Sequence, residues 1–186
     1  MSRLSYSFSE DSALLAKALS ALNPGGSFLE IGIGGGRNLR DFGGKFRLAV
    51  GTDILPRGEV GDSRIENAEI VIADRATCFR SGVFDVVAFN PPYLPSDSVS
   101  DVAVDGGSGG VQIPLAFLDE ALRVSTPRSK IIVVLSSLSN IEEFKSYCER
   151  ASLRLKILSE SGLFFETLYA CLIERNDTVR KSPATQ

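Results

Sequence analysis

Short, almost uninterrupted apolar runs are the feature of this sequence that most constrains its fold. These runs occupy residues 27–31, 46–51, 68–73, 83–89, 130–135, 153–158 and 168–174. Apolar residues recur at helical spacing in three other segments, at 11–22, 111–124 and 141–150. Strands that are apolar on both faces and alternate with helices are typical of an open parallel sheet with helices on both sides. The sequence therefore predicts an α/β fold.

The length and apolar content of the chain suit one globular domain. Its 186 residues are 44% hydrophobic, which is enough for a substantial core. We expect the domain to cover residues 1–175, with a polar tail at 176–186. The chain has no apolar run of about 18 residues and no charged-then-apolar leader, so we expect a cytoplasmic protein without a membrane span.

A polar residue lies at or near the end of each of the first four apolar runs. These residues are Glu30, Asp53, Asp74 and Asn90. In open parallel sheets, ligands bind in the crevice outside the carboxyl ends of the strands. We therefore expect the four side chains to converge on one ligand-binding crevice.

The chain contains no histidine. This absence excludes Ser-His-Asp and Cys-His nucleophilic schemes, imidazole general bases and metal sites that require imidazole. Cys78, Cys148 and Cys171 are far apart and form no CxxC pair. We therefore expect lone buried thiols, no disulfide framework and no metal.

The charge distribution disfavours a polyanionic partner. The net charge is −3, and residues 81–122 contain no Lys or Arg. The acidic residues in that stretch are Asp85, Asp97, Asp101, Asp105, Asp119 and Glu120. A protein that binds nucleic acid tightly neutralises phosphates with basic side chains, so we expect no nucleic-acid partner.

A glycine-rich turn follows the first apolar run, as it does in dinucleotide-binding proteins. The dinucleotide fingerprint requires glycines at relative positions one, three and six. Gly32 and Gly34 satisfy the first two positions, but Arg37 occupies the sixth. No Gly-Lys-Ser/Thr follows, so the sequence does not match a P-loop either.

The segment Glu30-x-Gly32-x-Gly34-x-Gly36, with Asp53 after the next strand, resembles motif I of class I S-adenosylmethionine-dependent methyltransferases. That resemblance implies a Rossmann-like fold with a seven-stranded, mostly parallel sheet, one antiparallel strand and helices on both faces. It implies S-adenosylmethionine as cofactor, with Asp53 on the ribose hydroxyls and Asp74 near the adenine amino group. The cofactor-binding residues it implies are Ser12, Glu30, Gly32, Gly34, Gly36, Asp53, Asp74 and Asn90.

The segment Asn90-Pro91-Pro92-Tyr93 ends the fourth apolar run and resembles motif IV of methyltransferases that act on planar nitrogens. In that family, the Asn side-chain carbonyl and the following Pro backbone carbonyl accept the two N–H bonds of the target. They turn the nitrogen lone pair towards the methyl group and stabilise the developing positive charge. The catalytic residues implied are Asn90, Pro91 and Tyr93, with Tyr93 packing on the planar target group.

Three further segments resemble HemK-like protein-glutamine N5-methyltransferases of release factors. They lie at 6–12, 104–110 and 161–168, with Phe8 and Val104 where proline and tryptophan are usual. The chain resembles the short branch of archaea and eukaryotes, which implies the glutamine of the Gly-Gly-Gln motif in a class I release factor as substrate. We expect this motif to enter an acidic mouth formed by residues 95–110.

The short branch also implies a small zinc-binding activator subunit. In the strand order of this class, the run Ala68–Ala73 is a sheet edge, and Ile70-Val71-Ile72 leaves that edge apolar and uncharged. Such an edge invites strand addition by a partner. The alternative is that residues 55–67 cover the edge themselves.

Other functions remain open at this stage. The same Asn-Pro-Pro-Tyr motif serves enzymes that methylate adenine or guanine amino groups in DNA or RNA, and an acidic mouth also suits a protein lysine. A non-catalytic scaffold with this fold is a third hypothesis, which the presence of Glu30, Asp53, Asp74 and Asn90 disfavours.

Overall fold

The structure is a computed structural model, and it describes residues 10–23, 25–54, 68–97, 101 and 103–176. Within these residues a seven-stranded sheet has the order β3-β2-β1-β4-β7-β9-β8. Its strands are β1 (Ser27–Ile31), β2 (Leu48–Asp53), β3 (Glu69–Ile72), β4 (Phe84–Phe89), β7 (Ser125–Ser136), β8 (Leu153–Gly162) and β9 (Thr167–Arg175). β9 is antiparallel to both of its neighbours, while β3, β2, β1, β4 and β7 pair in parallel. The predicted strand arrangement is confirmed.

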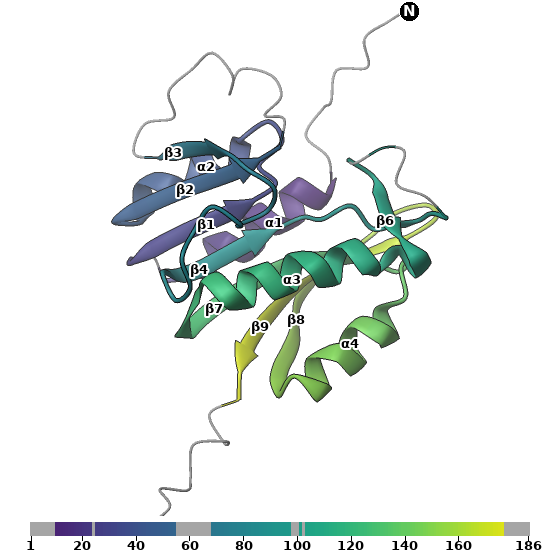
Figure 1. Cartoon of the computed structure of the whole chain (residues 1–186). Helices are drawn as coiled ribbons and strands as arrows, with labels where there is room; N and C mark the ends of the chain where they lie inside the picture. Colours follow the sequence, from purple (N-terminus) through teal and green to yellow (C-terminus); the bar gives the residue numbers. More distant parts are fainter. Residues whose placement is uncertain (1–9, 24, 55–67, 98–100, 102, 177–186) are drawn as a thin grey trace, which may run out of the picture.

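Helices cover both faces of the sheet. The helices are α1 (Glu10–Ser20), α2 (Arg37–Phe42), α3 (Gln112–Val124) and α4 (Ile141–Arg150), with short 3-10 turns η1 (Gly43–Lys45) and η3 (Ser108–Gly110). α3 and α4 lie in front of the sheet in Figure 1, and α1 and α2 lie behind it. Successive strand residues point to opposite faces, so Phe28 packs with α1 and α2 while Leu29 packs in the core of α3 and α4. Fully burying a side chain of this kind contributes about 1.5–3 kcal/mol.

Several element boundaries differ from the sequence prediction. β2 begins at Leu48 rather than at residue 46, because Phe46 lies before the strand and stacks on Phe28 with ring centroids 4.8 Å apart. β7 is longer than the predicted run at 130–135. The six-residue helix α2 was not predicted, since it is short and rich in polar residues. The expectation of buried thiols is wrong for Cys78, which is exposed after β3, whereas Cys148 and Cys171 are buried.

A small second sheet was also not predicted. It consists of β5 (Leu94–Pro95) and β6 (Asp105–Gly107), which pair in parallel directly after the Asn-Pro-Pro-Tyr segment. Two- and three-residue strands leave no periodic pattern in a sequence. Their pairing holds residues 105–107 close to the segment that follows β4.

Some expectations concern residues outside the described part of the chain. These are the segment 6–9, the proposed edge cover at 55–67 and the tail at 177–186. Of the helices that the structure describes, none is long and apolar enough to cross a membrane.

Candidate active site

The strand register brings most of the predicted site residues to one edge of the sheet. Ile31 of β1 pairs with Thr52 of β2 on one side and with Phe89 of β4 on the other. The next residue of each strand is therefore Gly32, Asp53 or Asn90, which form one row at the carboxyl edge. This row is the crevice that an open parallel sheet offers to a ligand.

The glycine loop between β1 and α2 is fixed by backbone hydrogen bonds. The Gly32 N–H donates to the Thr52 carbonyl at 2.7 Å, and the Gly34 N–H donates to Asp53 Oδ2 at 2.8 Å. Gly32, Gly34 and Gly36 have φ angles of 76°, 52° and 66°, a region that favours glycine. No atom of the described residues lies within 4 Å of a Cβ built at Gly34. The loop therefore exposes bare backbone to the space in front of it.

Glu30 is a buried acid beneath this loop. Asn38 Nδ2 donates to Glu30 Oε1 at 3.1 Å, while Glu30 Oε2 is buried without a hydrogen-bond partner among the described residues. Burial raises the pKa of Glu30 to about 8, although the hydrogen bond from Asn38 acts in the opposite direction. A ligand that donates a hydrogen bond to Oε2 would compensate this cost.

Two other predicted cofactor residues, Asp74 and Ser12, lie on elements outside this row. Asp74 is two residues past the end of β3; its exposed carboxylate accepts a hydrogen bond from Arg75 at 2.9 Å. The Ala73 N–H donates to the Asp53 carbonyl at 3.0 Å, so the start of this turn is held next to Asp53. Ser12 lies in the first turn of α1, where its N–H donates to Asp11 Oδ1 at 2.6 Å. The structure thus groups Glu30 and Asp53 with the glycine loop and places Asp74 and Ser12 on separate elements.

Asn90 carries a second unsatisfied acceptor. Its side-chain oxygen Oδ1 is buried and has no hydrogen-bond partner within the described part of the chain. Pro91, which follows, is buried as well, and the two prolines restrict the backbone after β4. Buried polar atoms without a partner are rare in native proteins, so each one needs an explanation.

The loop at 106–110 packs directly on the backbone of Tyr93. A Cβ at Gly106 would lie 2.8 Å from the backbone Cα and C atoms of Tyr93, and one at Gly110 would also collide with this backbone. Glycine is therefore required at both positions by close backbone approach. The sequence pattern at 104–110 thus has a structural role in holding the Asn-Pro-Pro-Tyr segment.

A cavity lies among the described residues of the predicted mouth at 95–110. A cavity of about 460 Å³ is lined by Pro95, Ser96, Asp97, Gly107, Ser108, Gly109 and Gln112. Asp97 is the acidic residue of this wall. Asp101 and Asp105 instead shape the loop, since the Asp101 N–H donates to Asp105 Oδ2 at 2.7 Å.

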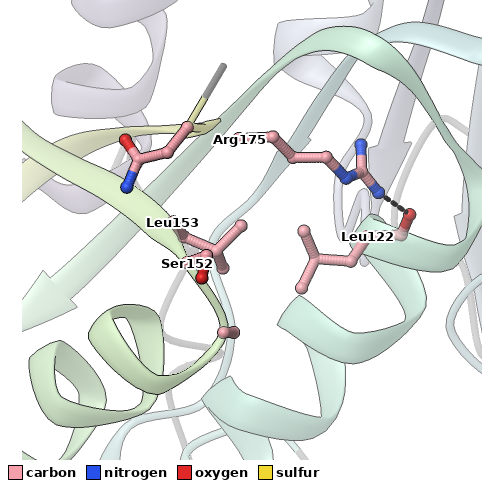
Figure 2. A pocket seen from close by; sticks show the side chains of 6 residues that line it. Leu122, Ser152, Leu153 and Arg175 are labelled. Carbon is pink, nitrogen blue, oxygen red and sulfur yellow. Dashed lines mark hydrogen bonds between the residues drawn. The ribbon is translucent and has the colours of Figure 1, made fainter. Parts of the chain in front are cut away.

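A second cavity lies at the opposite end of the sheet. It measures about 280 Å³ and is lined by Leu122, Ala151, Ser152, Leu153, Arg175 and Asn176 (Figure 2). The Arg175 guanidinium donates to the Leu122 carbonyl at 2.6 Å and to the Thr126 carbonyl at 2.8 Å. β7 and β8 begin here and β9 ends here, so this cavity is remote from the glycine loop and the guanidinium connects β9 to α3.

Sequence reasoning missed three residues around the site. Asn38 holds Glu30, Gln112 lines the mouth, and the Phe117 ring lies 3.5 Å from the position of a Cβ at Gly32. Gln112 and Phe117 belong to α3, where helical spacing indicated packing alone. Asn38 left no signal in the sequence, because its role depends on how the loop after β1 turns back over Glu30.

Known proteins were compared with this chain by family, by sequence and by structure. No protein-family model matches the chain. A Methanocaldococcus jannaschii protein that bears the name of a protein N5-glutamine methyltransferase is 30% identical over 175 residues, which cover 88% of each chain. The chain belongs to the family of protein N5-glutamine methyltransferases. The sequence-based family assignment is confirmed, and the enzyme is a methyltransferase.

Solved structures confirm the fold of this methyltransferase. Mtq2 in the E. cuniculi Mtq2–Trm112 complex, described as responsible for methylation of the eRF1 translation termination factor, superimposes with a TM-score of 0.73 and 23% identity. The match covers 92% of this chain and 98% of that chain. A Streptococcus mutans methyltransferase in complex with SAH gives a TM-score of 0.61 at 13% identity, covering 90% and 99%. The Rossmann-like class I methyltransferase fold is thus shown.

The residues of the methyltransferase at the glycine loop fit S-adenosylmethionine. The space in front of Gly34 has no protein atom of the described residues to fill it, and Glu30 Oε2 is an acceptor without a donor. Asp53 lies beside the loop with a carboxylate that can accept hydrogen bonds from vicinal hydroxyls. An open backbone turn with acidic acceptors around it suits a ligand that carries both hydroxyl and ammonium donors.

Proposed function

We propose that this enzyme methylates the side-chain amide nitrogen of a protein glutamine, in the Gly-Gly-Gln motif of a class I release factor. The observation that carries the proposal is the buried, unpaired Asn90 Oδ1 at the end of β4. It lies one residue beyond Phe89, which pairs with Ile31 directly before the glycine loop. An acceptor of this kind fits a substrate that brings an N–H donor.

S-adenosylmethionine supplies an electrophilic methyl group on its sulfonium. Asn90 Oδ1 and the Pro91 backbone carbonyl accept hydrogen bonds from the two amide N–H groups, which orients the amide so that the nitrogen lone pair faces the methyl group. The N–C bond forms as the S–C bond breaks, and one N–H proton leaves to solvent. Both carbonyl dipoles stabilise the positive charge that develops on nitrogen. The ring of Tyr93 packs against the planar amide.

The cofactor-binding roles are part of the proposal. Glu30 and Asp53 accept hydrogen bonds from the cofactor, and the glycine loop at 32–36 lets it approach the backbone. Asp74 contributes near the adenine end and Ser12 from the start of α1. The orphaned Oε2 of Glu30 and the open space at Gly34 support these roles.

Glutamine is favoured over the other planar nitrogens by charge. A nucleobase substrate would bring phosphates to a mouth whose flanking residues 81–122 contain no Lys or Arg. Phosphate contacts supply much of the affinity of proteins for nucleic acid. A primary amide also presents two coplanar N–H donors to two carbonyls, which a lysine ammonium does not.

We also propose a small zinc-binding activator subunit that pairs with β3. β3 is an edge strand of the sheet, and Ile72 on it is 74% exposed. Exposed apolar edges favour strand addition. The E. cuniculi Mtq2 chain was solved as a complex with Trm112, which supports a partner of this type. A release factor substrate would place the activity in the cytoplasm.

The test is a methyl-transfer assay with a class I release factor and the activator. We expect Asn90→Ala to lower kcat by about 100-fold or more, because it removes an acceptor for the amide. Asn23→Ala changes an exposed asparagine before β1 and serves as the matched control. Equal rates for Asn90→Ala and Asn23→Ala would overturn the proposal.

A further inference from the structure

Two phenylalanines are displayed to solvent at the turn between β8 and β9. Phe164 is 92% exposed and Phe165 is 83% exposed, and their rings pack edge to face with centroids 4.5 Å apart. Leu163 and Leu138 are exposed apolar residues of the same and the neighbouring loop. We call these four residues the tip patch. Large apolar side chains that gather outside the core mark interaction surfaces.

The tip patch lies at the active-site edge of the sheet. β8 runs in the same direction as β7, so its end at Gly162 is at the carboxyl edge. The Ser136 hydroxyl donates to the Glu166 carboxylate. The Ser137 N–H donates to the Thr167 carbonyl at 2.8 Å, and the Thr167 N–H donates to the Ser137 hydroxyl at 2.9 Å. The turn is therefore held against the loop between β7 and α4.

That same loop connects the tip patch to the mouth. The Asn140 N–H donates to the Gly109 carbonyl at 2.8 Å, and Gly109 lines the cavity of the mouth. The neighbouring Gly110 packs on the backbone of Tyr93. In Figure 1 the turn between β8 and β9 extends to the side of the molecule where β6 lies. Hydrogen bonds thus connect the turn that carries the patch to the loop that lines the mouth.

Charge defines what this surface can bind. The three segments that meet at this edge, residues 81–122, 131–144 and 157–174, contain no Lys or Arg. They do contain acidic residues, including Asp97, Glu160 and Glu166. Nucleic acids and anionic lipid surfaces are repelled by such a field. An apolar protein surface surrounded by basic residues is the complementary partner.

We propose that the tip patch docks the protein substrate of this enzyme, on a part of that protein outside the methylated motif; this proposal rests on the proposed function. Asn90, Pro91 and Tyr93 contact a single amide group, which cannot supply the affinity for a whole protein. Binding energy from remote contacts serves to position the reacting group. Aromatic side chains at the centre of an interface typically supply most of that energy.

The test compares two substrates in the presence of the activator. One is a whole class I release factor and the other is a short peptide that contains only its Gly-Gly-Gln loop. The double substitution Phe164→Ser with Phe165→Ser should raise KM for the whole protein about tenfold or more. Its kcat and its kcat/KM on the peptide should stay within about twofold of wild type. Its thermal unfolding midpoint should stay within about a few degrees, because both side chains are exposed.

Leu48→Ser is the matched control, since Leu48 is an exposed apolar residue at the opposite edge of the sheet. An unchanged KM for the whole protein in the double variant would overturn the docking proposal alone. An equal loss of kcat/KM on the whole protein and on the peptide would also overturn it. So would weaker binding of the activator by the double variant, or a loss of its self-association in sedimentation. Failure of the wild-type enzyme to methylate either substrate would overturn the proposed function itself.

Discussion

Glu30 illustrates how one side chain links the fold to the ligand. Its carboxyl is buried under the glycine loop, where Asn38 satisfies one oxygen and the described residues leave the other unpaired. The pKa of Glu30 rises from its ordinary value of 4.5 to about 8 because burial disfavours the charged form. Without a ligand, the protonated acid is therefore the more stable form at neutral pH.

This raised pKa predicts a specific pH dependence of stability. Between pH 4.5 and about 8 the unfolded chain loses the Glu30 proton while the folded chain keeps it, so folding stability falls as pH rises. Glu30→Gln removes this loss and should be more stable than wild type above pH 8, by at most on the order of 5 kcal/mol. Urea unfolding of both proteins at pH 4.5 and pH 8.5 measures it. If the difference in unfolding free energy between wild type and Glu30→Gln is the same at both pH values, the raised pKa of Glu30 is contradicted.

The site residues show what sequence could and could not reveal. Glu30, Asp53 and Asn90 were predicted because each lies at or next to the end of an apolar strand, and parallel strands end at one edge. Asn38 could not be predicted, since its role depends on how the loop turns back over β1. The exposure of Phe164 and Phe165 is likewise invisible to a hydrophobic pattern, which treats every apolar residue as a candidate for the core.

At the scale of elements, the loop at 106–110 supports the Asn-Pro-Pro-Tyr segment. Gly106→Ala would place a Cβ 2.8 Å from the Tyr93 backbone and force the two segments apart. Because a misplacement of about 1 Å can cost about 100-fold in rate, we expect kcat to fall at least about tenfold. Steady-state kinetics measures this effect. Gly162→Ala is the control, since a Cβ there meets no described atom within 4 Å; comparable kcat in both variants would refute this role.

The edge strand β3 makes a separate prediction about the activator. Ile72→Lys places a charge on an exposed apolar position of this strand. We expect it to weaken activator binding by about tenfold or more, while the unfolding midpoint of the free chain stays unchanged. Calorimetric titration of the activator measures the affinity, with Ile157→Lys on the exposed β8 as the control. Unaltered affinity would exclude β3 as the binding edge.

Element boundaries were predicted less well than the elements themselves. Continuous apolar runs located the seven strands, because strands buried on both faces need them. The start of β2 was misplaced since Phe46 is apolar but packs beside the strand on Phe28. β5 and β6 escaped prediction because each strand spans only two or three residues and leaves no periodic pattern.

At the scale of the whole molecule, three surfaces lie on the sheet. Two are at the carboxyl ends of its strands, and the third is the outer strand β3. The glycine loop and Asn90 lie at the carboxyl edge, the tip patch extends this edge beyond β8, and β3 closes the sheet on the other side. The chain contains no histidine, and the proposed methyl transfer needs none, because it relies on positioning and on carbonyl acceptors. In the proposed function, the protein substrate is recognised at the mouth and the tip patch, whose segments 81–122, 131–144 and 157–174 contain no Lys or Arg.

The central claim is that the methyl group goes to a glutamine side-chain amide. Its most direct test is mass spectrometry of a class I release factor after incubation with the enzyme, S-adenosylmethionine and the activator. We expect one added methyl group on the glutamine of the Gly-Gly-Gln motif, present with wild type and lost with Asn90→Ala. Methylation of a lysine or of a nucleobase in co-purified RNA, with that glutamine unmodified, would contradict it.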